Sequence, residues 1–300
     1  MGNTLGLCLI VRDEADLVAA NIAHHLELGF DRIAIMDNAS SDETGSILAC
    51  LAKTYPLTIV YQPDTDYRQD EWATILALKL GELGIDWAIS LDADEFIAPD
   101  GGTLRSIAAH FPDHPVICRR ENILPALRDR VAFDIAPLRT ARYRVVNPLG
   151  PVQNITIEPF EPKAPMMLRT MLGKCFVPLR GLRMIQRGNH DVDHDSTDRS
   201  VADGLLIRHF PLRPWVRFEQ KVVHARQRFA QEQGVWPTIS WHIRRWVRLA
   251  ETGDLESEYE SYFLTEPQIE ELLERGVIIE DSFGSDVTNR PSTIETHDRF

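Results

Sequence analysis

Several features that mark common protein classes are missing from this sequence of 300 residues. It has no run of about 18 apolar residues, which excludes a transmembrane helix. Its first residues lack a basic start before an apolar stretch, so we expect no signal peptide. Its cysteines are few and lie far apart, which argues against a zinc knuckle or a CxxC pair: Cys8, Cys50, Cys118 and Cys175. We therefore expect reduced, mostly buried thiols in a cytoplasmic protein.

Three glycine-based motifs are also absent. No Gly-x-Gly-x-x-Gly follows the first predicted strand, and no Gly-x-x-x-x-Gly-Lys-Ser/Thr occurs anywhere. These absences disfavour a dinucleotide oxidoreductase and a P-loop NTPase. A Gly-x-Ser-x-Gly elbow is missing too, which disfavours an α/β-hydrolase.

Basic residues are scarce, and they are unevenly placed. The chain has 32 Lys and Arg against 45 Asp and Glu, a net charge of −13, so it is a poor candidate for general nucleic-acid binding. Residues 1–100 hold 5 basic and 18 acidic side chains, whereas residues 101–225 hold 19 and 12. The pattern is compatible with ordinary solvated surface. It also suits an acidic, metal-using half beside a half that receives an anionic partner, such as a phosphorylated lipid or an acidic saccharide.

The first hundred residues alternate predicted strands and helices. Apolar runs predict strands at 5–11, 30–36, 57–61 and 87–91. Helical spacing predicts helices at 15–28, 40–53 and 69–83, the second opened by a capping box of Ser40 and Glu43. Strand ends spaced by roughly 25–30 residues suit right-handed βαβ crossovers and a parallel sheet. Ligands bind beyond the carboxyl ends of such strands, where this chain has polar residues: Arg12, Glu14, Asp37, Asn38, Asp64, Asp66, Asp92 and Asp94.

The acidic turn at residues 92–96 is the strongest single feature. In extended chain, residues two apart project to the same side, so Asp92 and Asp94 can face one ligand. Mg²⁺ or Mn²⁺, held by one or two carboxylates and by phosphate oxygens, is the usual partner of such a pair. Asp-x-Asp alone is also common in ordinary acidic turns. Its place after a strand of a βαβ array favours the metal site.

Blocks of residues along the chain resemble the GT-A glycosyltransferases, most closely the family 2-like and family 92-like branch. The similarity covers residues 4–100, through the blocks 11–14, 24–31, 37–42 and 91–96. It resumes further along the chain at 173–176, 188–190, 207–213 and 218–221. The resemblance implies an α/β fold, Rossmann-like, with a mostly parallel central sheet flanked by helices and with a helical C-terminal extension.

The same resemblance implies an organisation of the chain. Residues 1–225 would form the catalytic domain, in which residues 1–100 bind the nucleotide sugar and residues 101–225 the acceptor. Residues 226–284 are expected to form the helical extension. Residues 285–300 are polar and without pattern, so we expect a disordered tail.

As to activity, the resemblance implies a metal-dependent glycosyltransferase. It would move a hexosyl group from a nucleotide-diphosphate sugar, with a UDP-sugar favoured, to a hydroxyl of a saccharide or lipid-linked acceptor. The acceptor molecule can be anionic. The transfer would invert the configuration of the sugar, and the enzyme would act in polysaccharide or glycoconjugate biosynthesis. Mn²⁺ or Mg²⁺ would stabilise the negative charge that grows on the departing diphosphate. We expect no nucleic-acid partner, and at most peripheral association with the inner face of a membrane.

The resemblance also assigns roles to individual residues. The nucleotide would be bound by Val11, Arg12, Glu14, Asp37 and Asp92. The metal would be held by Asp92, Asp94 and His209. The diphosphate or the substrate would be contacted by Lys174, His190 and Arg213.

The catalytic base is where the sequence departs from the family pattern, because no acidic pair opens a helix well after the metal motif. The candidates are Asp191, Glu121 and Glu158, and Asp191 is favoured because it follows the turn at 188–190. Two other functions therefore stay open. A HAD-like phosphatase also uses Asp-x-Asp, but its motif should follow the first strand and prefers Thr or Ser where Phe96 stands. The second open function is that of a non-catalytic relative that binds sugar or nucleotide.

Three further features have two interpretations each. The acidic run 190–195 suggests a second metal site or, more simply, a mobile surface loop. The basic and aromatic segment 241–248 could face a membrane, although packing against the rest of the protein is the simpler reading. His24 and His25 are expected to pack or to point to solvent.

Overall fold

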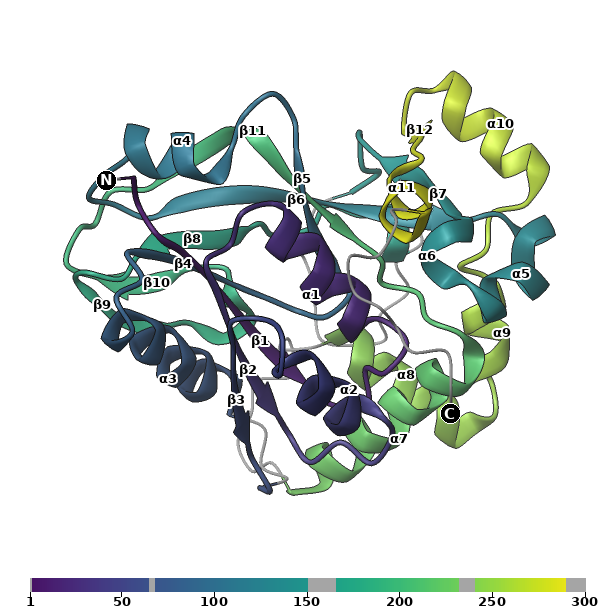
Figure 1. The fold of residues 1–300 in the computed structure, drawn as a ribbon. Coiled ribbons are helices and arrows are strands. Elements are labelled where there is room, and N and C mark those ends of the chain that lie inside the picture. Colours follow the sequence, from purple (N-terminus) through teal and green to yellow (C-terminus); the bar gives the residue numbers. More distant parts are fainter. Residues whose placement is uncertain (1, 65–67, 151–165, 232–240, 290–300) are drawn as a thin grey trace. The chain divides into compact units, whose positions relative to one another are not determined.

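The computed structural model describes residues 2–64, 68–150, 166–231 and 241–289 (Figure 1). The chain divides into two units. The first unit contains residues 1–120 and 172–209, and the second contains residues 121–171 and 210–289. This division differs from the predicted boundary at residue 225, because residues 121–171 group with the C-terminal helices and not with the N-terminal sheet.

Four parallel strands form the centre of the first unit. They lie side by side in the order β3–β2–β1–β4 (Figure 1). Their bounds match the predicted strands to within two residues: β1 (Leu5–Val11), β2 (Arg32–Asp37), β3 (Leu57–Tyr61) and β4 (Trp87–Leu91). Val11 pairs with Asp37, and Asp37 with Tyr61, so these strands end level with one another. Their polar end residues therefore share one edge of the sheet.

Helices cover both faces of this sheet. On β1, the odd-numbered leucines pack with α1 (Val18–Glu27) and α2 (Thr44–Leu51) in one apolar cluster. Cys8 points to the other face and packs with α3 (Gln69–Glu82). The predicted α/β class, with a parallel core of strands between helices, is confirmed.

The start of α2 differs from the prediction. Ser40 Oγ accepts a hydrogen bond from the backbone of Asp13, at 3.0 Å, so it is engaged away from the helix. Thr44 donates from both its backbone N and its Oγ1 to Asp42 Oδ1, at 2.9 and 2.6 Å. The predicted capping box of Ser40 and Glu43 is therefore wrong, because the loop after β1 competes for Ser40.

Antiparallel strands extend the sheet of the first unit, which is therefore mixed. β8 (Lys174–Pro178) pairs with β4, and the first residues of β6 (Val116–Pro125) pair with β8. β5 (Glu95–Pro99) pairs with β11 (Ser200–His209), which places His209 opposite Glu95. The remaining elements of this unit are α4 (Leu104–His110), β9 (Leu182–Ile185), η3 (Arg187–Asn189) and β10 (Val192–His194).

The second unit contains the predicted C-terminal helices. They are α7 (Trp215–Gln231), α8 (Trp241–Thr252), α9 (Leu255–Glu260), α10 (Glu266–Glu274) and α11 (Phe283–Asn289). The other elements are η1 (Leu127–Asp129), α5 (Arg130–Ile135), α6 (Pro137–Thr140), β7 (Ala141–Val145), η2 (Met166–Leu168) and β12 (Ile278–Glu280). Because α11 reaches residue 289, the segment 285–289 is helical and not disordered as expected. Residues 290–300 of the expected tail lie outside the described residues.

The basic and aromatic segment at 241–248 packs within the second unit. Trp246 is buried, and its Nε1 donates to Tyr262 Oη at 2.7 Å. Arg245 pairs with Glu258 at 2.9 Å. These contacts agree with the packing interpretation and not with a membrane-facing one. Within the described ranges, no helix has both the length and the apolar content needed to cross a bilayer.

Gly173, which precedes β8, offers a test of this packing. A Cβ there would collide with the carbonyl oxygen of Cys118 and lie 2.7 Å from Ile117 Cγ2. We expect Gly173→Ala to lower the free energy of unfolding by about 1–3 kcal/mol, as overpacking does. In Gly81→Ala, the control on α3, the new Cβ would meet Leu179 at an ordinary 3.8 Å, and we expect a gain of roughly 0.5–1 kcal/mol. Urea unfolding measures both variants, and equal stabilities would contradict the close approach of Gly173 to Cys118.

Candidate functional site

The acidic turn between β4 and β5 is held in place by a side chain of α1. Asn21 Nδ2 donates to the carbonyl oxygens of Ala93 and Glu95, at 3.0 and 2.8 Å. Asn21 is fully buried, so water does not compete for these bonds. The backbone that carries Asp92 and Asp94 is therefore fixed to the helix that covers the sheet.

Two buried histidines on α1 brace the strand that follows the turn. His24 Nε2 lies 2.6 Å from the carbonyl oxygen of Ile97. The backbone N of Ile97 donates to His25 Nε2 at 3.3 Å, so the proton of His25 sits on Nδ1, which donates to the carbonyl oxygen of Asn21. Burial holds the pKa of His25 well below its usual range. Of the two predicted alternatives, packing or exposure to solvent, both histidines therefore follow the first.

Glu95, the next residue of the turn, is fully buried as a carboxylate between two cations. Lys174 Nζ lies 3.1 Å from Oε2, and Arg120 donates to Oε1. The backbone N of Asp92 also donates to Oε2, at 2.9 Å. Burial alone would raise the pKa of Glu95, but the charges of Lys174 and Arg120 outweigh burial and lower the pKa to about 2.

Lys174 also binds Asp92. Its Nζ lies 2.9 Å from Asp92 Oδ2, and its side chain is only 1% exposed. The Asp92 side chain is 42% exposed, so it keeps access to solvent while its charge is matched by a buried ammonium. Lys174 thus contacts two carboxylates of the turn, whereas the sequence predicted a contact with the diphosphate.

Asp94 and His209 form the part of the site that suits a metal ion. Asp94 is buried, and among the described residues its Oδ1 has no hydrogen-bond partner. His209 Nε2 lies 3.7 Å from that oxygen. A buried carboxylate oxygen without a donor is costly, and a divalent cation beside an imidazole would satisfy it. These two residues therefore fit the predicted Mn²⁺ or Mg²⁺.

Asp92, the third predicted metal ligand, is not part of this pair, because its carboxylate contacts Lys174. The described part of the chain contains no group of three or more His, Cys, Asp or Glu side chains arranged to hold a metal ion. Asp94 and His209 would hold a cation only together with water or substrate oxygens, which is common for Mg²⁺ and Mn²⁺. The residues present thus fit a metal shared with the substrate.

The ends of β1 and β2 carry the other predicted nucleotide-binding residues. The backbone N of Ser40 donates to Asp37 Oδ1, at 3.0 Å, and Asp37 is buried. The backbone N of Glu14 donates to Thr44 Oγ1, at 2.8 Å. Val11 and Arg12 precede this loop, and β4, which leads to Asp92, is the other neighbour of β1. The structure thus brings the five predicted residues to one edge of the sheet.

Glu95, Lys174, Arg120 and Asp92 form a charged cluster. Of the predicted substrate-binding residues, His190 lies close enough to this cluster to feel its charges. Its Nδ1 is 2.7 Å from the carbonyl oxygen of Gly173. Burial, together with the nearby charges of Lys174 and Arg120, lowers the pKa of His190 to about 4. His190 is therefore neutral at neutral pH. Arg213 belongs to the second unit, where its carbonyl oxygen accepts a hydrogen bond from Tyr259.

The candidate bases that the structure describes are both held by arginines. Asp191 Oδ1 lies 2.8 Å from Arg199 Nε. Glu121, in the second unit, pairs with Arg144 at 2.6 Å. Glu158 lies outside the described residues.

The acidic run at 190–195 lies in an ordered hairpin of β9 and β10. Arg183 Nη2 lies 2.7 Å from Asp193, and Arg183 also pairs with Asp195. His194 is buried and lies 2.9 Å from the carbonyl oxygen of Arg180. These aspartates already have an arginine between them, so the suggestion of a second metal site gains no support.

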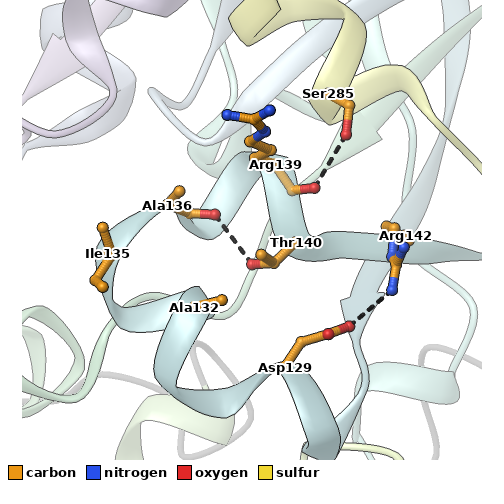
Figure 2. A pocket seen from close by; sticks show the side chains of 8 residues that line it. All are labelled: Asp129, Ala132, Ile135, Ala136, Arg139, Thr140, Arg142 and Ser285. Carbon is orange, nitrogen blue, oxygen red and sulfur yellow. Dashed lines mark hydrogen bonds and ion pairs between the residues drawn. The ribbon is translucent and has the colours of Figure 1, made fainter.

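A pocket of the second unit, drawn in Figure 2, contains none of the predicted site residues. Its volume is about 420 Å³, and a neighbouring pocket of about 510 Å³ shares Arg142 and Ser285 with it. Asp129 and Arg142, which line it, pair with each other at 3.0 Å, and Ser285 Oγ donates to the carbonyl oxygen of Arg139. Its polar groups largely satisfy one another, so we assign it no ligand.

The sequence did not identify three residues that organise the site: Asn21, Glu95 and Arg120. Glu95 stands beside the predicted metal pair, and its burial was the missing information. No local sequence pattern marks Asn21 or Arg120 as a site residue. The partners of Asn21 lie 72 and 74 residues away in sequence, and the partner of Arg120 lies 25 residues away.

Comparisons with solved structures find distant similarities. No protein-family model and no curated protein matches the chain. The S. aureus TarS fragment 1–349 in complex with UDP-GlcNAc matches with 11% identity and a TM-score of 0.41, over 87% of this chain and 73% of that chain. The same fragment in complex with UDP matches with 11% identity and a TM-score of 0.34, over 49% and 42%. GalNAc-T7 with UDP, GalNAc and Mn²⁺ matches with 15% identity and a TM-score of 0.30, over 41% and 24%.

In the last two alignments this chain spans less than half of the matched chain's length. At such TM-scores the similarities carry no argument of their own, so the function has to be argued from the residues of the site.

Replacing Glu95 by Gln tests the charged cluster through its pH dependence. The pKa of Glu95 lies below its unfolded value, so its contribution of about 3 kcal/mol is complete above about pH 4.5 and is lost as the pH falls towards 2. We expect Glu95→Gln to be less stable than the wild type at pH 6, by an amount that shrinks by about 2 kcal/mol at pH 3. Urea unfolding at both pH values measures this. A constant difference would mean that Glu95 is not held as a buried carboxylate.

Proposed function

We propose that this protein is a nucleotide-sugar-dependent glycosyltransferase of GT-A-like fold. The single observation that carries the proposal is the buried Asp94 oxygen, which faces His209 at the edge of the sheet where Asp37 also lies. A nucleoside diphosphate bound at this edge would bring phosphate oxygens that complete the coordination of a cation. A divalent ion supplies charge stabilisation for a departing diphosphate without proton transfer.

The chain's own residues suit the other parts of the donor. Val11, Glu14 and Asp37 lie at level strand ends, where a nucleoside would be held by backbone groups and carboxylates. Asp92 follows β4 with a partly exposed carboxylate, which can accept hydrogen bonds from a ribose or sugar hydroxyl. We propose a UDP-sugar as the donor, which is the donor that the resemblance of the sequence favours.

The finer parts of the proposal concern the acceptor and the base. We propose a saccharide or lipid-linked hydroxyl as acceptor, transfer of a hexosyl group with inversion, and a place in polysaccharide or glycoconjugate biosynthesis. A base must then take the acceptor proton on the face opposite the leaving group. Asp191, Glu121 and Glu158 remain the candidates. Asp191 would have to exchange its contact with Arg199 for one with the acceptor.

One observation favours a second candidate function, a nucleotide-sugar-binding protein without catalysis. Both candidate bases that the structure describes, Asp191 and Glu121, are neutralised by arginines. Such a protein would bind the donor with its metal but would not release the sugar.

Thermal unfolding against a panel of UDP-, GDP-, dTDP- and CMP-linked sugars tests the shared part of both functions. A ligand at about 100 times its dissociation constant adds about 2.7 kcal/mol of stability. We expect one nucleotide class to raise the melting temperature with Mn²⁺ and much less with EDTA. Asp94→Asn should lose the Mn²⁺-dependent part, whereas Asp203→Asn, at an exposed carboxylate of β11, should keep it. If no nucleotide sugar shifts the melting temperature, the proposed function is wrong.

Turnover separates the enzyme from the binding protein. We expect slow release of free sugar from the stabilising donor in the presence of Mn²⁺, because water replaces a missing acceptor. Release of phosphate from p-nitrophenyl phosphate is the control for a phosphatase, and we expect none. Binding without any sugar release, with or without a saccharide or lipid-linked acceptor mixture, would favour the non-catalytic function.

A further inference from the structure

Four charged side chains of the first unit form a neutral cluster around the acidic turn. Lys174 Nζ lies 2.9 Å from Asp92 Oδ2 and 3.1 Å from Glu95 Oε2, and Arg120 binds the other oxygen of Glu95. Three of the four side chains are almost removed from water, with exposures of 0% for Glu95, 1% for Lys174 and 7% for Arg120. Two carboxylates and two cations balance, so the cluster needs no further counterion.

This balance has a direct consequence for Asp92. A divalent cation on Asp92 Oδ2 would lie close to the buried Lys174 ammonium, and the two positive charges would repel each other. The ammonium is covalently fixed and buried, so ions in solution displace it poorly. Asp92 is thus already occupied by a cation that belongs to the protein.

Asp94 is in the opposite situation. Its Oδ1 is buried and has no hydrogen-bond donor among the described residues, and the nearest basic group, His209 Nε2, is 3.7 Å away. Among the described residues, only His209 pairs with the Asp94 carboxylate, and it matches that charge only when it is protonated. The two aspartates of one motif therefore present different surroundings to an incoming cation.

We propose that Lys174 is the fixed counterion and positioning residue of Asp92, and that it keeps the Asp92 carboxylate from coordinating a divalent cation. The identity of the bound cation and substrate rests on the proposed function, but the Lys174–Asp92 contact does not. Asp92 is then held at the rim of the site, ready to accept hydrogen bonds from substrate hydroxyls. This assignment replaces the sequence-based roles of Asp92 as metal ligand and of Lys174 as diphosphate ligand.

Lysine NMR tests the contact without any ligand. The chain has only five lysines: Lys53, Lys79, Lys163, Lys174 and Lys221. With ¹⁵N-labelled lysine at pH 7, we expect one ammonium signal with slow proton exchange, lost in Lys174→Arg. Asp92→Asn should shift this signal, and the matched Asp203→Asn should leave it unchanged. If Lys174→Arg does not fold, Arg variants of the other four lysines assign the signal by elimination.

The NMR experiment has clear contrary outcomes. Absence of a protected ammonium signal would overturn the buried Lys174 contact. A protected signal that Asp92→Asn does not move would show that Lys174 serves Glu95 alone, and the proposal would fail.

Mn²⁺ binding, followed by the EPR signal of the free ion with and without UDP, tests the metal assignment. We expect Asp94→Asn to weaken Mn²⁺ binding by about tenfold or more, and Asp92→Asn by less than about threefold. Lys174→Met should strengthen Mn²⁺ binding, because it frees the Asp92 carboxylate. In the double variant Lys174→Met/Asp92→Asn this gain should disappear.

Equal weakening by Asp92→Asn and Asp94→Asn would overturn the metal assignment, even if UDP still binds. No Mn²⁺ binding by the wild type under either condition would overturn it as well. If the NMR result holds but no nucleotide binds, the proposed function fails while the role of Lys174 stands.

Discussion

The burial of the Glu95 carboxylate is the constraint on which the rest of the site depends. A carboxylate removed from water is strongly unfavourable unless cations and hydrogen-bond donors surround it. Here Lys174 comes from β8 and Arg120 from β6, while the backbone of Asp92 supplies a further donor. Losing one partner of such a buried pair costs about 3–5 kcal/mol, so this carboxylate ties the acidic turn to two strands distant in sequence.

The contacts of Lys174 make the two aspartates of the acidic turn electrostatically different. Because Lys174 serves both Glu95 and Asp92, the first aspartate of the motif is neutralised, whereas Asp94 beside His209 is not. Asn21 holds the backbone of the turn from α1, which keeps the two aspartates in these different places. A metal-assisted transfer from a nucleotide sugar would use this asymmetry, with one carboxylate for the cation and one for hydroxyl groups of the substrate.

Much of this architecture could be predicted from the sequence, because strands and helices depend on patterns within short segments. The apolar runs of β1 and β4 and the helical spacing of α3 are properties of short segments. The approach of His209 to Asp94 came from the resemblance and not from spacing. The role of Lys174 could not be predicted, because its contact with Asp92 joins residues 82 positions apart and depends on how β8 pairs with β4. The capping box at Ser40 failed for a similar reason, since a second loop competes for its hydroxyl.

The measurement that tests the central claim most directly is anomalous X-ray scattering at the manganese edge, from crystals grown with Mn²⁺ and UDP. The expected result is one manganese peak within coordination distance of Asp94 and His209, with Asp92 still bound to Lys174. A peak coordinated by Asp92, with Lys174 displaced, would contradict the division of roles between the two aspartates. Ordered UDP without any manganese near the acidic turn would contradict the metal site itself.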